Sequence, residues 1–218
     1  MTALASSARS LLLLLAASAV WAQTPNPAQP YILSVSYGGT GCPQGSVGSS
    51  FTNDRTAFTL VLDSFIASSG PNIPITEKTK SCTLNVNLHL PPGHSIWAQT
   101  STAKGYAQMP AGQDASITSR AVLSTPPGER KDDEQDADDN GVSERVNLTK
   151  FKGPVAKDYT VVDGHQYAVE TDCAATSYVR TITLQYALAV SGPDTSQLTL
   201  DSLDGKINVV KTKACKKD

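Results

Sequence analysis

The alternation of apolar and polar residues predicts short β-strands along most of the chain. The clearest case is the segment 83–90, where leucines and a valine at even positions alternate with Asn85, Asn87 and His89. Alternation with a period of two residues is typical of a strand that has one buried face and one polar face. A Pro-Pro-Gly sequence follows and ends this strand in a turn.

Other parts of the chain repeat this pattern less completely. The segments 56–66 and 178–190 alternate in the same way, and shorter candidates lie at 33–37, 161–162 and 207–209. No segment after residue 22 shows a convincing apolar stripe of helical period. Many short strands separated by glycine and proline are typical of antiparallel sandwiches. We therefore predict an all-β protein, with a single antiparallel β-sandwich over residues 31–218.

The first 22 residues have the three parts of a secretory signal peptide. Arg9 supplies a positive charge, residues 11–20 are unbroken apolar sequence, and Ala22 completes a small-residue cleavage site. A proline-rich leader, residues 23–30, comes next. The C-terminal segment is charged, so we expect neither a lipid anchor nor a membrane anchor. The sequence predicts a protein secreted to the extracellular space.

Four cysteines follow the predicted cleavage site: Cys42, Cys82, Cys173 and Cys215. An even number of cysteines in an exported chain indicates two disulfides. Three pairings are possible. We favour Cys42–Cys82 with Cys173–Cys215, because each bond then closes a loop within one half of the chain.

An acidic segment interrupts the strand pattern at about residues 129–144. It holds eight acidic and two basic residues, so we interpret it as a solvated insertion. Asp136, Asp138 and Asn140 have the spacing of the first half of a calcium loop. The glutamate expected at position 12 of such a loop is replaced by Asn147, which weakens the calcium hypothesis. Asn147 also begins an Asn-Leu-Thr sequon, for which we predict glycosylation.

The residues point to no reaction. The formal net charge is −2, which gives no reason to expect nucleic acid as a partner. The three histidines lack the third ligand and the supporting residues of a metal site, and we expect them at the surface. His89 and His94 flank the Pro-Pro-Gly turn and could face each other across a hairpin. We assign no catalytic residue and expect no cofactor, apart from the calcium alternative.

Two functional hypotheses follow. The first is a non-enzymatic extracellular protein that acts at the cell wall or at a host or substrate surface, with a wall polysaccharide or an extracellular protein as partner. The second is a carbohydrate-binding module, or a carbohydrate-active enzyme with an unrecognised site. Trp97, Tyr106 and Tyr178 could stack on sugar rings, although core packing is the commoner role of a single aromatic residue in a strand.

Several separated motifs resemble a family of small secreted proteins common in fungi. They are YGGTGCPQGSV from residue 37, FIASSGPNIPITEKTKSCTLNVNLHLPPG, FKGPVAKDY and DSLDGKINV. The family is catalogued as a domain of unknown function, and the resemblance covers roughly residues 31–215. It implies an exported all-β protein with cysteines at these four places, which supports the favoured pairing. It implies no activity, and the acidic segment departs from the family pattern.

Overall fold

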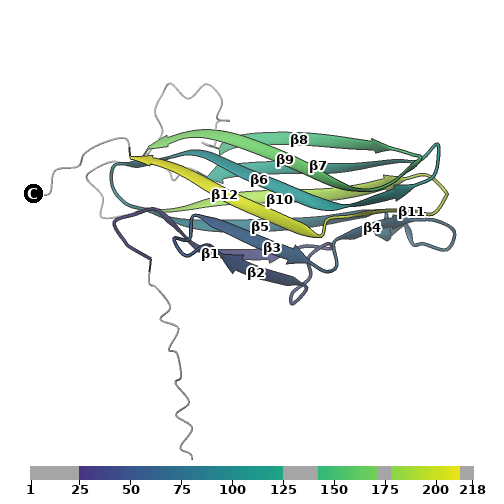
Figure 1. Cartoon of the computed structure of the whole chain (residues 1–218), viewed down its shortest axis with the longest axis horizontal. Coiled ribbons are helices and arrows are strands. Elements are labelled where there is room, and N and C mark those ends of the chain that lie inside the picture. Colours follow the sequence, from purple (N-terminus) through teal and green to yellow (C-terminus); the bar gives the residue numbers. More distant parts are fainter. Residues whose placement is uncertain (1–24, 125–141, 171–177, 212–218) are drawn as a thin grey trace, which may run out of the picture.

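The computed structural model describes residues 25–124, 142–170 and 178–211. These residues form twelve strands in two sheets and one short 3-10 helix, η1 (Ile75–Glu77). Every strand pairing is antiparallel. Figure 1 shows the long strands running side by side in two layers.

The first sheet has five strands. In spatial order these are β1 (Tyr31–Gly38), β5 (Thr79–Leu90), β10 (Tyr178–Ser191), β7 (Asp114–Ser124) and β8 (Val142–Lys152). The second sheet has seven. Its order is β2 (Val47–Phe51), β3 (Ala57–Leu62), β12 (Ser202–Lys211), β6 (His94–Met109), β11 (Ser196–Thr199) and β4 (Ile66–Ser69), and β9 (Val155–Glu170) pairs with β6.

One apolar core lies between the sheets. The five-stranded sheet contributes even-numbered apolar side chains of β5 and β10, which include Leu84, Val86 and Ile182. Arg180 of β10 is the charged exception among the buried even-numbered residues of these two strands. The seven-stranded sheet contributes residues such as Leu60 and Leu203. Because successive strand residues point to opposite sides, burial of the even positions leaves the odd positions of β5 and β10 on the outside. This alternation confirms the predicted strand class of both segments.

A disulfide between Cys42 and Cys82 joins the glycine-rich segment after β1 to β5. The Gly41 N–H donates to the Ser81 carbonyl oxygen at 2.8 Å, and the Ser81 N–H donates to Thr40 Oγ1 at 3.0 Å. Gly39 must be a glycine here, because a Cβ atom would clash with the Ser81 carbonyl oxygen. The segment is thus a tight turn held against β5.

The structure confirms an all-β protein of two antiparallel sheets, and it shows the first of the two predicted disulfides. Cys173 and Cys215 lie outside the described residues, so their pairing stays a prediction. Residues 1–22 also lie outside, as does the acidic segment up to residue 141. Its last three residues begin β8.

Within the predicted leader, the Pro27 carbonyl oxygen lies 2.9 Å from His89 Nε2.

The Pro-Pro-Gly turn after β5 does not form the hairpin that the sequence suggested. β5 belongs to the five-stranded sheet and β6 to the seven-stranded one, so the chain crosses from one layer to the other at this turn. Gly93 supports the crossing with a φ of 73°, which glycine adopts without strain. His94 is only 8% exposed, and its Nδ1 lies 3.2 Å from the Pro92 carbonyl oxygen. The expectation of a surface histidine at position 94 was therefore wrong.

Removing the observed disulfide should destabilise the fold. A Cys42→Ser/Cys82→Ser variant frees a loop with a sequence separation of 40 residues, so we expect a loss of about 2–5 kcal/mol in the free energy of unfolding. Urea unfolding measures this. An unchanged midpoint would contradict the stabilising role, and peptide mapping without reduction should recover Cys42–Cys82 together with the predicted Cys173–Cys215 pair.

Candidate functional site

The outer side of the five-stranded sheet carries a continuous set of polar side chains, which we call the polar face. Strand register places its members in rows across β1, β5, β10 and β7. It consists of Ser34, Ser36, Thr83, Asn85, Asn87, Ser116, Thr118, Arg120, Thr181, Thr183 and Gln185. Val122, Ala187 and Ala189 are outward apolar residues of β7 and β10 in these rows, and the exposed Val146 and Leu148 continue two of the rows on β8. The face exists because the opposite side of the same strands is buried.

Neighbouring strands are linked across the polar face by side-chain hydrogen bonds. Thr181 Oγ1 donates to Asn87 Oδ1 at 2.7 Å, and Asn87 Nδ2 donates to Ser34 Oγ at 3.0 Å. In the next row, Thr183 Oγ1 donates to Asn85 Oδ1 at 2.9 Å. The side chains on β5 and β10 are half-buried and held in defined orientations by these bonds. A ligand would meet a pre-ordered surface.

Charge is sparse at the centre of the polar face. Arg120 is the single ionised member of the set defined above, and its Nη1 donates to Gln185 Oε1 at 3.4 Å. At one end of the face the rings of Tyr31 and His89 stack with centroids 4.7 Å apart. Val179, opposite His89 in β10, is exposed beside them. The face therefore offers mainly neutral donors and acceptors.

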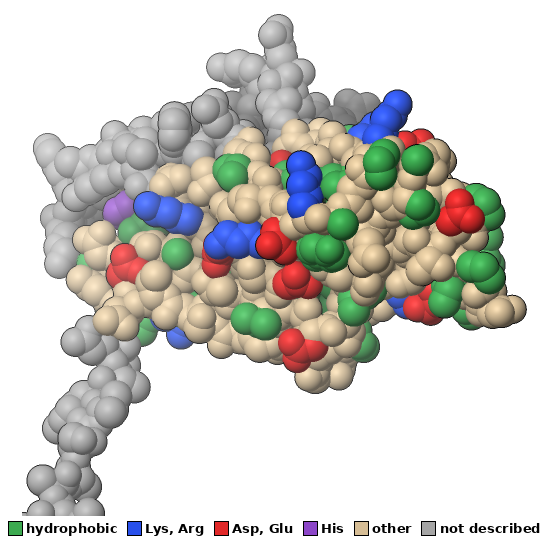
Figure 2. Space-filling view, turned by 45° about the vertical axis from the view of Figure 1, so that its right-hand side comes forward, with side chains coloured by type: hydrophobic (Ala, Val, Ile, Leu, Met, Phe, Trp, Pro, Cys, Tyr) green, Lys and Arg blue, Asp and Glu red, His purple; other side chains and the backbone are tan. Residues whose placement is uncertain are grey.

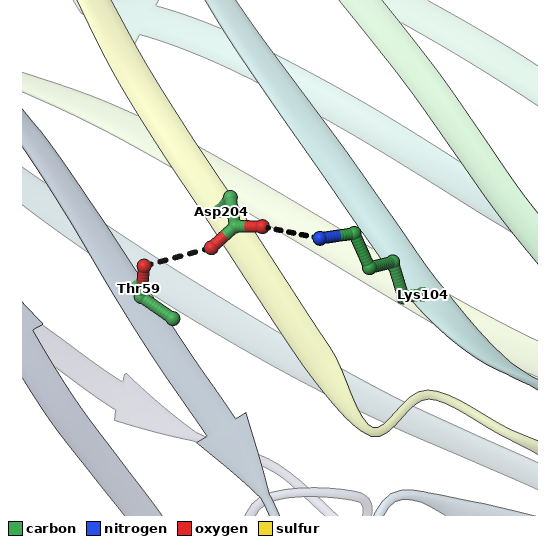
Figure 3. Close-up of polar contacts among 3 residues, drawn as sticks. All are labelled: Thr59, Lys104 and Asp204. Atoms are coloured by element: carbon green, nitrogen blue, oxygen red, sulfur yellow. Dashed lines mark hydrogen bonds and ion pairs between the residues drawn. The ribbon is translucent and has the colours of Figure 1, made fainter.

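The outer side of the seven-stranded sheet differs in character. The space-filling view of this side shows basic and acidic side chains next to one another, with hydrophobic ones among them (Figure 2). Asp204 of β12 accepts a hydrogen bond from Thr59 Oγ1 at 2.7 Å and pairs with Lys104 Nζ at 3.1 Å (Figure 3). These contacts use both carboxylate oxygens and join β3, β12 and β6. We interpret them as structural.

A second polar cluster lies inside the sandwich. Asp163 of β9 is 6% exposed and accepts hydrogen bonds from Ser119 Oγ and, at 3.3 Å, from Asn147 Nδ2. Ser101 of β6 is paired with Asp163 across the sheet, and its Oγ accepts a 2.7 Å hydrogen bond from the Tyr186 hydroxyl. Both oxygens of the Asp163 carboxylate are occupied and the group is buried. It is placed to hold β7, β8 and β9 together rather than to reach a substrate.

The structure places the sequon asparagine on the inward side of β8, opposite Ser119. Asn147 is nevertheless exposed as a residue, because β8 is an edge strand. Its Nδ2, the atom that would carry a glycan, is the donor to Asp163. Glycosylation of Asn147 stays a prediction, and a glycan there would have to leave one N–H for Asp163.

The other predicted site residues are not brought together by the structure. Asp136, Asp138 and Asn140 lie outside the described residues, so the calcium alternative stays a prediction. Within the described ranges, no group of three or more His, Cys, Asp or Glu side chains could hold a metal ion. Of the three aromatic residues considered for sugar stacking, Tyr106 is half-buried and stands opposite Asp158. The structure does not describe the side chains of Trp97 and Tyr178.

The sequence did not predict that the residues of the polar face form one surface. The signal was present in β5, where Asn85 and Asn87 occupy the odd positions, and in β10, where Thr181 and Thr183 do the same. What the sequence did not reveal is that these two strands are neighbours with their odd residues opposite each other.

Residues 28–215 match a family model described as a domain of unknown function, DUF4360. The chain belongs to the DUF4360 family. A similar protein is an uncharacterized secreted protein of the fungus Arthroderma benhamiae, 33% identical over 140 residues. That match covers 64% of this chain and 51% of the relative, so the chain spans about half the length of the curated relative.

Membership in DUF4360 and this secreted fungal relative confirm the resemblance to a secreted fungal family of unknown function. They also confirm the predicted extracellular location. No helix among the described residues is long and apolar enough to cross a membrane.

The solved structures that are similar at low level include one of a protein in complex with a sugar. It is that of TmCBM61 in complex with β-1,4-galactotriose, with a TM-score of 0.28 and 12% identity over 83% of this chain and 90% of that chain. A similarity this low carries no argument about the fold or the ligand of the present protein.

The contacts of Asp204 predict a pH-dependent contribution to stability. The hydrogen bond from Thr59, together with the hydrogen bond and charge of Lys104, holds the pKa of Asp204 below its ordinary value. A lowered pKa in the folded state stabilises the fold above the unfolded-state pKa of about 3.9. This contribution is lost as pH falls through the folded-state pKa.

Asp204→Asn should therefore lower the melting temperature at pH 7, and the difference from wild type should shrink below about pH 4. Thermal unfolding between pH 7 and pH 2 measures it. Thr59→Val, which removes the main hydrogen bond, should reproduce part of the effect. A difference that grows on acidification would refute the assignment.

The Asp163 cluster predicts a cost for removing its carboxylate. Asp163→Ala would leave the buried Ser119 hydroxyl without its acceptor and remove the partner of Asn147. We expect a loss of about 1–3 kcal/mol in the free energy of unfolding. Asp163→Asn is the matched control, because it keeps one acceptor oxygen and should lose less. Equal stability of the alanine variant and the wild type in urea would rule out this role.

Proposed function

We propose that the protein is a non-catalytic extracellular binding protein that attaches to wall polysaccharide through the polar face. The observation that supports this most directly is the pre-ordered array of hydroxyl and amide groups on β1, β5, β10 and β7. Sugar polymers present many hydroxyl groups, which donate and accept hydrogen bonds as these side chains do. A long open sheet surface matches an extended polymer better than a small molecule, for which a concave pocket is usual.

The composition of the polar face favours a polysaccharide over other macromolecules. The centre of a typical protein–protein interface is apolar and rich in aromatic residues, whereas the central rows here are Thr, Asn, Ser and Gln. Nucleic acid requires a basic surface that neutralises phosphates, and Arg120 alone among the face residues is ionised. A polymer rich in hydroxyl groups fits these properties of the central rows.

The network also retains capacity for a ligand. Thr181 and Thr183 each donate one hydrogen bond, and a hydroxyl oxygen can still accept two. The Asn85 amide nitrogen is bonded to none of the residues that the structure describes, so its two N–H groups are available. Because the side chains are already held in place, binding loses little rotamer entropy.

A non-catalytic role agrees with the contacts that several of the described carboxylates make. Five of them are engaged by neighbouring side chains, either in hydrogen bonds or in ion pairs. They are Asp54, Glu77, Asp163, Asp194 and Asp204. Glycoside hydrolysis uses two carboxyl groups facing each other across the scissile bond. None of the residues that define the polar face carries a carboxylate.

The proposal is tested by pull-down of the secreted protein on insoluble β-glucan, chitin and cellulose and on immobilised polygalacturonate. We expect retention on one polymer, and about tenfold weaker binding for Thr181→Val/Thr183→Val, since each lost hydrogen bond contributes about 0.5–1.5 kcal/mol. The matched control is Thr102→Val/Thr160→Val, the same change on the outward side of the seven-stranded sheet. It should bind like wild type.

Thermal unfolding of both double variants shows whether they are folded. Retention on none of the polymers, or equal loss of binding in the two double variants, would overturn the assignment of the polar face.

A further inference from the structure

One end of the polar face opens into a hollow between β7, β8 and β10, which we call the lysine hollow. Its lining includes Asp114, Ser116, Lys150, Lys152, Ala189 and Ser191. Register places Ser116 beside Lys150 and Ala189 in one row, and Asp114 beside Lys152 and Ser191 in the next. Both rows lie on the outer side of the sheet and continue the rows of the polar face.

The shape of the lysine hollow follows from side-chain size. Ala189 and Ser116 are small and half-buried, whereas Lys150 and Lys152 are exposed on the edge strand β8. Small residues on the inner strands beside long ones at the edge leave a depression with a basic rim. Ala187, in the adjacent row of β10, extends the low floor toward the polar face.

The two lysines supply the positive charge of the hollow. Lys80 pairs with Glu77 and Lys104 with Asp204, but neither Lys150 nor Lys152 forms an ion pair with a residue that the structure describes. Asp114 is the carboxylate of the lining, and its main-chain oxygen accepts a hydrogen bond from Ser191 Oγ. The lining therefore carries one net positive charge, in contrast to the neutral centre of the face.

We propose that the lysine hollow is a subsite for a carboxylate-bearing sugar, so that the bound polymer is an acidic polysaccharide containing uronic acid. The inference rests on the proposed function, because the polymer must lie along the polar face to reach the hollow. Lys150 and Lys152 attract the carboxylate. The Ser116 hydroxyl donates to or accepts from the hydroxyls of the same sugar, and Ser191 Oγ accepts from them, because its proton is donated to the Asp114 main-chain oxygen. Asp114 opposes the anion and limits the affinity.

The test compares two forms of one polymer, polygalacturonate and its methyl ester, which differ in charge and share the same backbone. Wild type should bind the acidic form about fivefold to tenfold more tightly at low ionic strength, and this preference should shrink as salt screens the charges. Lys150→Gln/Lys152→Gln should remove the preference. Asp114→Asn should increase it, because it removes the repulsion.

The matched control is Lys157→Gln/Lys206→Gln, which removes two exposed lysines away from the lining of the hollow. Its preference for the acidic form should stay near that of wild type if the effect is local. A preference that survives Lys150→Gln/Lys152→Gln, or that falls equally in the control, would overturn the subsite.

The outcomes separate the two proposals. Equal binding of both polymer forms by wild type, with loss of both in Thr181→Val/Thr183→Val, would refute the subsite and support the polar face. The polar face would be refuted as the docking surface if binding of the acidic form is unchanged in Thr181→Val/Thr183→Val but is weakened in Lys150→Gln/Lys152→Gln.

Discussion

Burial of the even-numbered side chains of β5 and β10 is the constraint on which the rest of this structure depends. Leu84, Val86, Ile182 and Leu184 are each at most 2% exposed. A strand has a period of two, so their burial fixes every odd residue on the outside. A slip of one residue would exchange the two sets and place asparagine and threonine in the core, where they would lack hydrogen-bond partners. The same interaction stabilises the fold and creates the polar face.

The two outer surfaces show how one architecture can support different roles. On the seven-stranded sheet, Asp204 is neutralised by Lys104 and bonded to Thr59, which leaves little capacity for a ligand. On the five-stranded sheet, neutral side chains bond to one another and keep unused donors and acceptors. Charge remains unpaired where the sheet ends, at Lys150 and Lys152.

The sequence predicted the strands whose alternation is strong and missed those whose alternation is weak. β5 alternates leucine and valine with polar residues, and it was recognised. β7 buries Ala115, Ser119 and Ala121, which are too small or too polar to produce a clear apolar period, so it was not recognised. The pairing of β5 with β10 joins residues about a hundred positions apart, and the order of strands is a property of packing that no local pattern carries. The polar face could not be assembled without it.

A site made of separate rows on an open sheet surface implies a particular kind of binding. Neighbouring rows repeat at about 6.8 Å along a strand and neighbouring strands at about 4.8 Å, so each row can engage only a small part of a ligand. Individual hydrogen bonds to water-exposed hydroxyls contribute little free energy. Several rows acting on one chain gain from effective concentration, because the second contact is intramolecular once the first has formed. Affinity should then come from the length of polymer along β5 and β10, and the charge at Lys150 and Lys152 should select which polymer is held.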